Sequence, residues 1–452
     1  MAEQRAHWGS KLGFVLAAAG SAVGLGNIWK FPYVTGRNGG GAFVLIYLAC
    51  VALVGLPVMV AEILLGRASQ KSPVGAFRDL SRPRSPWVFF GLLGVAGSFL
   101  LLSYYSVVAG WALHYSWLSL SGALVAQGPN GMQPLFQQVY ESPLLNLSYH
   151  LLFMGLTILV VLGGVAKGLE RWSRILMPAL FVMMLILLGR AFMLDGFGRG
   201  FEFVFGLHTE QLTGRGVLEA LGQAFFSLSL GMGAMITYGS YLRREDDIMS
   251  AAITISVLDT LIALLAAVVL FPILFSYGME PAQGPGLVFI TIPIALSQMP
   301  AGSFLASVFF LLLVFAALTS SISMLEVATS YFIDERSWSR AKATLVSGGA
   351  IAAIGIPAAL AGGPGFFGAG MTALVGANWF DTVDYLVSNW FLPLGGLGIS
   401  LFTAWRLDDA IRHDHFLSGS KLAFFYRAWL ALLRLVVPFA IVLVLLHAVG
   451  VI

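Results

Sequence analysis

Gly20-Ser21-Ala22-Val23-Gly24-Leu25-Gly26-Asn27 interrupts the first long apolar segment of the chain, Lys11 to Val34. A helix in hydrocarbon satisfies its own backbone polar groups, and a break is tolerated only where the freed groups face protein or a cavity. We therefore predict a membrane helix that unwinds midway. A second such stretch, Ser227-Leu228-Ser229-Leu230-Gly231-Met232-Gly233, lies in the second half of the chain. Two interrupted segments at matching places indicate the binding site of a secondary transporter.

The composition places the whole chain in a membrane. Its residues are 58% hydrophobic and 10% charged, whereas an ordinary soluble domain has roughly 25% charged residues. The first apolar run is too long and wrongly flanked for a cleaved signal peptide. Apolar runs of ~20 residues cross a ~30 Å hydrocarbon core, and such runs predict eleven spans at 12–36, 41–66, 87–120, 147–165, 173–194, 216–241, 249–277, 301–332, 342–361, 374–405 and 424–450.

The distribution of Lys and Arg predicts the orientation, because cytoplasmic loops carry an excess of both. An inner or plasma membrane protein with a cytoplasmic N-terminus and an extracellular C-terminus fits best. The net charge of +3 then reflects topology, so we expect the lipid bilayer but no nucleic acid or protein as a partner. The basic residues placed inside are Arg5, Lys11, Arg67, Lys71, Arg78, Arg82, Arg84, Lys167, Arg171, Arg174, Arg243, Arg244, Arg336, Arg340, Lys342, Arg406, Arg412, Lys421 and Arg427.

The two interrupted segments also predict the domain organisation. Each begins a set of five spans, and an odd number of spans inverts the second set relative to the first. The predicted fold is thus an all-α polytopic membrane protein with a 5+5 inverted repeat. Its parts are a cytoplasmic N-terminal segment at 1–10, repeats at 11–194 and 216–405, an extracellular connection at 195–215, and a cytoplasmic loop with an accessory eleventh helix at 406–452.

Other chemistries find little support in the residues. The single cysteine, Cys50, excludes an intramolecular disulfide. No phosphate-binding loop, zinc-spaced His/Cys set or hydrolase elbow is present, and intramembrane Asp259 and Glu62 have no histidine companion. His413-Asp414-His415 is interpreted as a solvated turn. We therefore expect a protein that is not an enzyme.

Three stretches resemble the neurotransmitter:sodium symporter family. They are Gly24-Leu25-Gly26-Asn27-Ile28-Trp29-Lys30-Phe31-Pro32, Asn38-Gly39-Gly40-Gly41-Ala42-Phe43 and Gly222-Gln223-Ala224-Phe225-Phe226-Ser227-Leu228-Ser229. The resemblance runs from Arg5 to about Arg427 and is greatest to bacterial amino-acid transporters, especially the multi-hydrophobic amino acid type. It implies alternating access and sodium-coupled uptake of hydrophobic L-amino acids. A sodium-independent carrier or a non-transporting amino-acid sensor of the same fold remains the alternative.

The resemblance also implies two sodium sites. Taken alone, hydroxyls on membrane helices usually bond back to their own helix, and glycines usually mark close helix packing. Only the long motifs favour ligand roles. The first site would use the substrate carboxylate with Ala22, Asn27, Ser227 and Asp259, and the second would use Gly20, Val23, Ala316, Thr319 and Ser320.

Asp259 is the most informative single residue, because an ionisable group deep in an apolar run is functional by default. The family often has asparagine there, and its chloride-dependent members have a serine four residues later. Some bacterial members have a carboxylate at that later position, where this chain has Ala263. Tyr47, Gln223 and Ser227 match the remaining chloride-site positions. Our hypothesis is that Asp259 both binds sodium and supplies the fixed negative charge, so that no chloride is required.

The substrate site implied by the same resemblance lies at both breaks. Freed amides with Tyr105 would hold the carboxylate, and freed carbonyls with the Ser229 hydroxyl would hold the ammonium. The side-chain pocket contains no charge, and methionine adapts to varied shapes, although Met232 and Met324 are also consistent with core filler. Gly24 replaces the aspartate of amine transporters. The predicted substrate residues are Ala22, Leu25, Gly26, Leu101, Tyr105, Phe226, Ser227, Ser229, Met232, Ser320, Ser323 and Met324.

Gates follow from the resemblance as well. Lys30 and Asp384 match an outer ion pair, with Tyr105 and Phe226 closing over substrate. Gly168 and Pro178 match a helix-unwinding motif in the fifth span. Glu62 matches a carboxylate that caps amides of the first break, and its usual partner glutamate is replaced by Ile399. The residues that match an inner network holding the N-terminus are Arg5, Trp8, Ser240, Tyr241 and Asp334.

Overall fold

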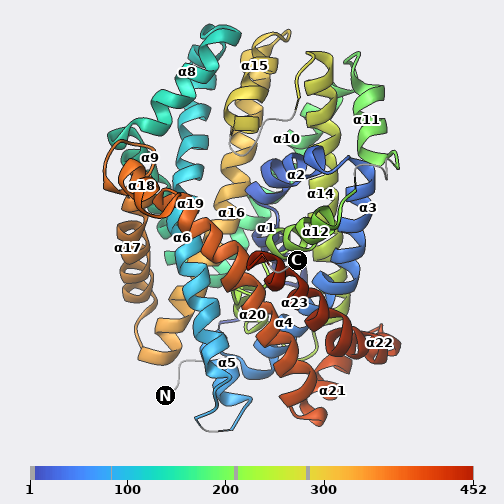
Figure 1. Cartoon of the computed structure of the whole chain (residues 1–452). Coiled ribbons are helices and arrows are strands. Elements are labelled where there is room, and N and C mark those ends of the chain that lie inside the picture. Colours follow the sequence, from blue (N-terminus) through green and yellow to red (C-terminus); the bar gives the residue numbers. More distant parts are fainter. Residues whose placement is uncertain (1–5, 83, 208–211, 281–285, 451–452) are drawn as a thin grey trace.

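The structure is a computed structural model that describes residues 6–82, 84–207, 212–280 and 286–450 (Figure 1). Within these ranges the regular structure is helical throughout, as the apolar runs predicted. Among the described residues, nine helices are long and apolar enough to cross a membrane. They span Gly41–Ser69, Val88–Leu120, Pro143–Leu162, Val165–Ala191, Ile248–Ser276, Gly302–Arg336, Arg340–Ala359, Trp379–Arg406 and Ala423–Ala448.

Both predicted breaks are present. The segments Lys11–Ala22 and Gly26–Arg37 pass the same test for a membrane span only as a pair, and they meet at an angle of 50°. The second predicted break separates α12 (Gly214–Ser227) from α13 (Ala234–Gly239). Neither of these two helices is long enough to span alone, so the predicted total of eleven spans rests on counting them together.

The first half of the chain also contains two helices, α8 and α11, that lie at the upper end of Figure 1. Their apolar residues are too few to signal a span, and neither helix was predicted. The elements of this half are α1 (Lys11–Ala22), η1 (Gly26–Lys30), α2 (Phe31–Arg37), α3 (Gly41–Cys50), η2 (Val51–Gly55), α4 (Leu56–Ser69), α5 (Pro73–Asp79), α6 (Val88–Leu120), α7 (Ala123–Ala126), α8 (Gly128–Glu141), α9 (Pro143–Leu162), η3 (Val165–Glu170), α10 (Arg171–Ala191) and α11 (Phe197–Phe205).

The second half contains a short apolar pair, η5 and α15, that was likewise not predicted. Its elements are α12 (Gly214–Ser227), α13 (Ala234–Gly239), α14 (Ile248–Ser276), η5 (Leu287–Thr291), α15 (Ile292–Ser297), α16 (Gly302–Arg336), α17 (Arg340–Ala359), η6 (Phe366–Gly370), α18 (Met371–Val375), α19 (Trp379–Leu386), η7 (Val387–Phe391), α20 (Leu392–Leu401), η8 (Phe402–Arg406), α21 (Asp409–Leu417), η9 (Ala423–Phe425), α22 (Tyr426–Ala431), η10 (Leu432–Val436) and α23 (Val437–Ala448).

Wide π-helical turns recur in these helices for a physical reason. Pro32, Pro57, Pro293, Pro393 and Pro438 each occupy the second residue of an α-helix that directly follows a π-helical segment. A proline inside a helix lacks an N–H and clashes with the carbonyl four residues earlier. The wider turn before each proline makes room for its ring without ending the span.

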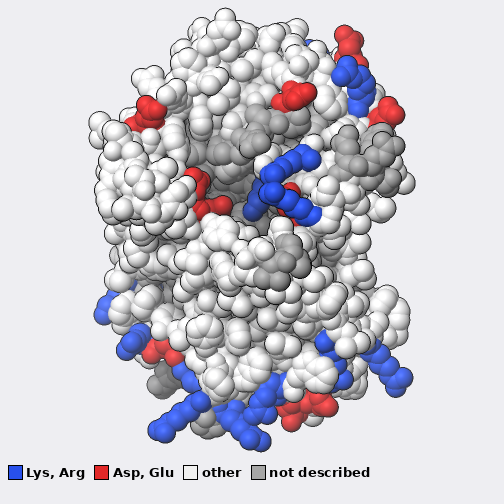
Figure 2. All heavy atoms as spheres, in the orientation of Figure 1, with Lys and Arg blue, Asp and Glu red and all other residues white. Residues whose placement is uncertain are grey.

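The helix α16 lies at the centre of the bundle. Its most apolar window is 89% buried, whereas that of the last span, Ala423–Ala448, is only 28% buried. Space-filling Figure 2 shows Lys and Arg gathered around the lower end, where α5 and α21 lie in Figure 1. It also shows a hollow in the upper half, rimmed by charged side chains of both signs.

Candidate functional site

The first break exposes main-chain groups to side chains from distant parts of the sequence. The helix α1 ends at Ala22, and Val23 adopts an extended conformation with ψ 107°. The amide of Gly24 donates to Asn27 Oδ1 at 3.0 Å, and the amide of Leu25 donates to the Tyr105 hydroxyl at 3.3 Å. The predicted break is therefore real, but it occupies only Val23 to Leu25 of the quoted stretch.

The second break is built on left-handed backbone. Ser229, Gly231 and Gly233 have φ values of 53°, 82° and 75°, a region that glycine adopts without steric cost. The Ser229 hydroxyl donates to the carbonyl of Ser21 at 2.8 Å and thereby ties the two breaks together.

Glu62 corrects one expectation. Its Oε1 accepts from the amide of Gly231 at 2.8 Å, so it caps the second break and not the first. Ile399, at the place of the missing glutamate, is buried on α20. The helix α20 packs closely against the second break, since a Cβ on Gly395 would lie 2.0 Å from the Gly231 carbonyl oxygen.

Asp259 lies at the centre of an oxygen cluster beside the first break. Its Oδ2 accepts from the Ser227 hydroxyl at 2.7 Å, and its Oδ1 accepts from the Asn27 amide nitrogen at 2.7 Å. That nitrogen also lies 3.1 Å from the Asp259 carbonyl oxygen and 3.0 Å from Ser227 Oγ. Tyr47 donates to Ser227 Oγ at 3.2 Å. The predicted side chains of the first sodium site thus meet, although they come from three separate elements.

The charge of this cluster favours a cation. Within the described residues, no Lys, Arg or His lies within 4 Å of the Asp259 carboxylate, which is fully buried on α14. The side-chain oxygen of neighbouring Gln223 is also buried without a partner, while its nitrogen donates to the Gly26 carbonyl at 3.2 Å. Carboxylate, hydroxyl and amide oxygens are the ligands that hard cations prefer. The donor set would fit a sodium ion if the Asn27 amide, whose nitrogen faces Asp259 here, turned to present its oxygen.

A second oxygen set joins α16 to the first break. Ser320 Oγ lies 3.5 Å from the carbonyl oxygen of Gly20 and 3.3 Å from that of Val23. The Thr319 hydroxyl donates to the carbonyl of Ala316 at 3.0 Å, the back-bond expected of a helical threonine. The structure therefore brings together all five residues of the second predicted sodium site.

A small cavity of about 20 Å³ lies between the breaks. Two predicted substrate residues do not line it: Ser227 faces Asp259, and Ser323 donates to the carbonyl of Ser320 at 2.8 Å. Gly24 and Leu392 also line the cavity. Gly24 could have been predicted because it lies in the first break, whereas no sequence pattern pointed to Leu392. The predicted residues that line the cavity are Ala22, Leu25, Gly26, Leu101, Tyr105, Phe226, Ser229, Met232, Ser320 and Met324.

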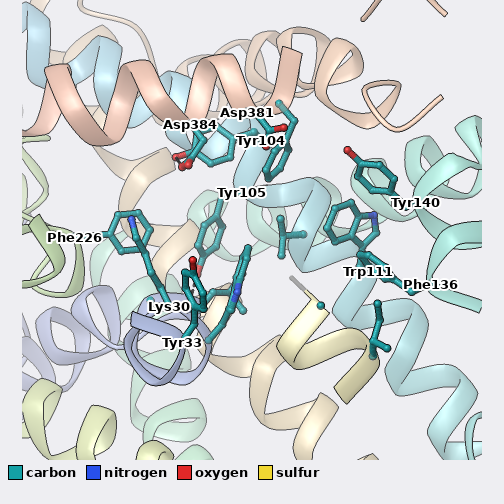
Figure 3. Close-up of a pocket in the computed structure, with 17 residues that line it drawn as sticks. Lys30, Tyr33, Tyr104, Tyr105, Trp111, Phe136, Tyr140, Phe226, Asp381 and Asp384 are labelled. Atoms are coloured by element: carbon teal, nitrogen blue, oxygen red, sulfur yellow. Dashed lines mark hydrogen bonds between the residues drawn. The ribbon is translucent and has the colours of Figure 1, made fainter. Parts of the chain in front are cut away.

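Figure 3 shows a larger cavity of about 540 Å³, and Tyr105 and Phe226 line both this cavity and the small one. Lys30 and Asp384 line the larger cavity, but no ion pair between them is present in the part of the chain that the structure describes. The Lys30 ammonium lies 4.1 Å from the centroid of the Phe226 ring, and Asp384 accepts from the Tyr104 hydroxyl at 2.8 Å. A lysine offers a point charge that an aromatic face also attracts.

Two residues of the predicted inner network meet, because the Trp8 amide donates to the carbonyl of Tyr241 at 3.2 Å, whereas Arg5 lies outside the described residues. The Trp8 indole donates to the carbonyl of Tyr238 at 3.0 Å, and the Tyr241 hydroxyl donates to Glu326 at 2.5 Å. Ser240 donates to the carbonyl of Thr237 at 2.6 Å, and Asp334 accepts from the amide of Ser72 at 2.5 Å.

Two carboxylates extend this network beyond the predicted residues. Glu326 is fully buried and pairs with both terminal guanidinium nitrogens of Arg340, at 2.7 and 2.9 Å. Glu170 accepts from the amide of Gly9 at 2.7 Å and from the Ser10 hydroxyl at 3.2 Å. Glu326 could have been identified from the sequence, because it is a carboxylate inside an apolar helix.

Glu170 also belongs to the predicted helix-unwinding region. Gly168 lies in η3, and Pro178 lies inside α10, which continues η3. A Cβ on Gly168 would lie 2.2 Å from the Val160 carbonyl oxygen, so only glycine fits there. The span is continuously helical from Val165 to Ala191 in this structure, and its unwinding stays a prediction.

Comparisons with known proteins agree with this geometry. The sequence model of the sodium:neurotransmitter symporter family matches residues 5–130 and 135–449. An uncharacterised sodium-dependent transporter from Bacillus subtilis is 42% identical, with 100% of this chain and 99% of the relative covered. One from Haemophilus influenzae is 34% identical, with 98% of each covered.

A solved structure extends the likeness to three dimensions. The crystal structure of MhsT in complex with L-phenylalanine superimposes with a TM-score of 0.90 at 42% identity, covering 98% of this chain and 100% of that one. This match confirms the predicted all-α inverted-repeat fold with two broken helices. The chain is a member of the sodium:neurotransmitter symporter family.

Proposed function

We propose that the protein carries hydrophobic L-amino acids, aliphatic and aromatic, into the cell together with sodium ions by alternating access. The family is that of sodium-coupled symporters, and MhsT was solved with L-phenylalanine bound. The observation that carries the proposal is the pair of oxygen clusters at the first break, one around Asp259 and one around Ser320. Two clusters favour two sodium ions.

The substrate class follows from the residues between the breaks. A zwitterion needs donors for its carboxylate, which the amides near Leu25 and the Tyr105 hydroxyl would supply. The same carboxylate would complete the coordination of the ion beside Asp259. Among the described residues, no charged side chain lines the small cavity, and Met232 and Met324 are unbranched side chains that adapt to different shapes. These features favour apolar side chains of varied size.

The buried charge of Asp259 supports transport without chloride. Ala263 follows one turn later on α14 and is fully buried, so it offers neither a hydroxyl nor a second carboxylate. Bound sodium would balance the Asp259 charge directly, whereas an added anion beside that carboxylate would be repelled.

Orientation and gating complete the proposal. The basic lower end would face the cytoplasm, with the N-terminus inside, the C-terminus outside and the repeats at 11–194 and 216–405. The large cavity would then open outward, and Tyr105 and Phe226 would separate it from the substrate. Trp8, Tyr241 and Asp334 would close the inner side.

Uptake into proteoliposomes tests the proposal. We expect accumulation of labelled leucine or phenylalanine with an inward sodium gradient, and unchanged uptake when gluconate replaces chloride. Equal uptake with potassium in place of sodium would favour a sodium-independent carrier. Binding without any uptake would favour a sensor. Loss of uptake when gluconate replaces chloride would contradict the proposal that no chloride is required.

A further inference from the structure

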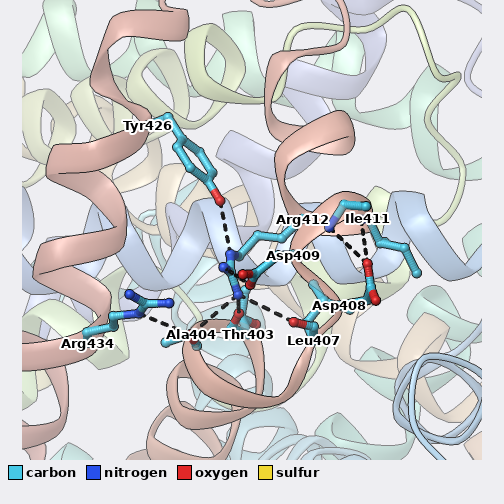
Figure 4. Close-up of polar contacts among 10 residues, drawn as sticks. Thr403, Ala404, Leu407, Asp408, Asp409, Ile411, Arg412, Tyr426 and Arg434 are labelled. Atoms are coloured by element: carbon cyan, nitrogen blue, oxygen red, sulfur yellow. Dashed lines mark hydrogen bonds and ion pairs between the residues drawn. The ribbon is translucent and has the colours of Figure 1, made fainter.

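Two arginines hold the end of the span Trp379–Arg406 (Figure 4). Arg412 is buried and donates to the carbonyls of Thr403, Ala404 and Leu407 at 3.2 to 3.4 Å. Arg434 approaches from the other side and donates through Nε to the Ala404 carbonyl at 3.2 Å. The last carbonyls of a helix have no partner within it, so both arginines supply missing donors.

The two arginines differ in what else they bind. Arg412 also contacts the Tyr426 hydroxyl at 3.1 Å and forms an ion pair with Asp409. Arg434 has no carboxylate within 4 Å among the described residues, and its remaining donors are free of hydrogen bonds there. Its guanidinium lies 5.0 Å from the centroid of the Trp405 ring, which is 63% exposed.

The surroundings of Arg434 face the membrane. Arg434 lies inside the span Ala423–Ala448, whose apolar window is only 28% buried. On the same helix, Leu435 and Phe439 are 68% and 67% exposed. Arg434 itself is partly buried, and its terminal nitrogens form no hydrogen bond within the described residues, so they are available to a ligand at this lipid-facing side of the helix.

Two exposed arginines lie close to this position in the sequence. Arg406 adjoins Trp405, and Arg427 lies two helical turns before Arg434; both are exposed, and neither has an ion-pair partner among the described residues. The nearby carboxylates are already used, because Asp408 caps α21 through the amide of Ala410 at 2.8 Å and Asp409 pairs with Arg412. We call Trp405, Arg406, Arg427 and Arg434 the Arg434 patch.

We propose that the Arg434 patch binds the phosphate headgroup of an anionic phospholipid. A guanidinium donates two parallel hydrogen bonds to a phosphate, and Trp405 is of the type that occupies the headgroup level of a bilayer. Basic pockets between membrane helices on one side of the bilayer bind anionic headgroups. The acyl chains would lie along the exposed face of η10 and α23.

Lipid binding by the purified protein in mixed-lipid nanodiscs tests the proposal. We expect phosphatidylglycerol to bind in preference to phosphatidylcholine, and Arg434→Gln to weaken its binding by about 5-fold or more, the loss of one charge-assisted contact. Arg434→Lys should lose part of this preference, because lysine keeps the charge but lacks the two parallel donors of a guanidinium. Arg336→Gln, which removes an exposed charge elsewhere at the same end, is the matched control.

The outcomes separate the possible roles of Arg434. A headgroup site predicts that phosphatidylglycerol raises the melting temperature of the wild type but not of Arg434→Gln, and that inorganic phosphate does not reproduce the effect. Equal destabilisation of Arg434→Gln in both lipids would reduce Arg434 to a helix cap and overturn the proposal, as would unchanged phosphatidylglycerol binding. Sodium-dependent amino-acid binding should persist in Arg434→Gln, so this test stands apart from the transport mechanism.

Discussion

Asp259 gives the sharpest test at the scale of single residues. Asp259→Asn keeps the shape and an oxygen that accepts from Ser227, but it removes the buried negative charge. We expect the sodium concentration for half-maximal substrate binding to rise by about 10-fold or more, since a lost contact to a charged group costs roughly 1.5–3 kcal/mol. Sodium titrations of labelled amino-acid binding measure this.

Ser256→Ala is the matched control for Asp259. Ser256 is buried on the same helix and contacts the Met59 sulfur at 3.7 Å. Its replacement should leave the sodium dependence unchanged. An unaltered sodium requirement in Asp259→Asn would remove Asp259 from the ion site.

His415 predicts a pH dependence of stability. Burial and the neighbouring Arg67 guanidinium lower the pKa of the His415 ring below its ordinary value, although Asp414 opposes them. The folded state then resists protonation more than the unfolded state does. The stability associated with neutral His415 is complete above the ordinary pKa and is lost as the pH falls through the lowered one.

Melting temperatures between about pH 7 and pH 5, the range in which histidine titrates, test this prediction. His415→Gln should flatten the loss of stability toward acid pH, whereas His413→Gln, at an exposed position, should leave it unchanged. Identical acid profiles for the His415 variant and the wild type would contradict the assigned role.

Much of the candidate site was predictable at this scale because its residues lie in long motifs. Asn27, Ser227 and Asp259 were found and do come together, and Ser320 does contact the first break. The contacts of two other residues were predicted wrongly. Lys30 lies over Phe226 and not against Asp384, and Glu62 caps the second break. A motif fixes which residue is present, but the direction of a flexible side chain depends on neighbours that are remote in sequence.

At the scale of elements, the second break depends on glycine. A Cβ on Gly231 would lie 2.1 Å from the Leu392 carbonyl oxygen, and its φ of 82° disfavours other residues. We expect Gly231→Ala to lower the apparent melting temperature, since strained backbone of this kind costs roughly 1–3 kcal/mol. Substrate binding should fall with it.

Gly222→Ala is the control within the same broken span. Gly222 lies in α12, and a Cβ there would meet nothing within 4 Å. This change should be neutral or stabilising by up to ~1 kcal/mol, because alanine favours a helix over glycine. Equal melting temperatures for the two variants would show that the break tolerates side chains.

The N-terminal segment predicts a second element-scale result. Glu170 accepts two hydrogen bonds from Gly9 and Ser10 and also pairs with Arg174 at 2.5 Å. Glu170→Gln weakens these contacts because a neutral acceptor binds less strongly than a carboxylate. Hydrogen exchange of residues 6–13 should therefore accelerate.

Glu141→Gln serves as the comparison for Glu170, since among the described residues its carboxylate accepts only from Gln137, at 2.9 Å, on the distant helix α8. Exchange at residues 6–13 should match the wild type in this variant. Unchanged exchange in Glu170→Gln would mean that the Glu170 carboxylate does not hold the segment.

The elements themselves were predictable where the apolar runs were long and uniform. The spans and both breaks follow from apolar runs punctuated by glycine. The helices α8, α11 and α15 were missed because they are short and lie beside spans. The π-helical turns before prolines such as Pro57 also escaped, since a hydropathy pattern does not register the width of a helical turn.

At the scale of the whole molecule, the two halves meet at the two breaks, where the backbone lacks helical hydrogen bonds. Ser229 contacts Ser21 across the breaks, and Ser320 brings the buried helix α16 to the same place. Asp259 adds a negative charge without a basic partner within the described residues. The fold therefore concentrates oxygen atoms and one net charge at its centre.

Equilibrium binding of labelled L-phenylalanine or L-leucine to the purified protein, in sodium and in potassium at equal ionic strength, tests this central claim most directly. We expect saturable binding in sodium, a steep dependence on sodium concentration and none in potassium. Equal affinity in the two salts would contradict a cation site at the breaks.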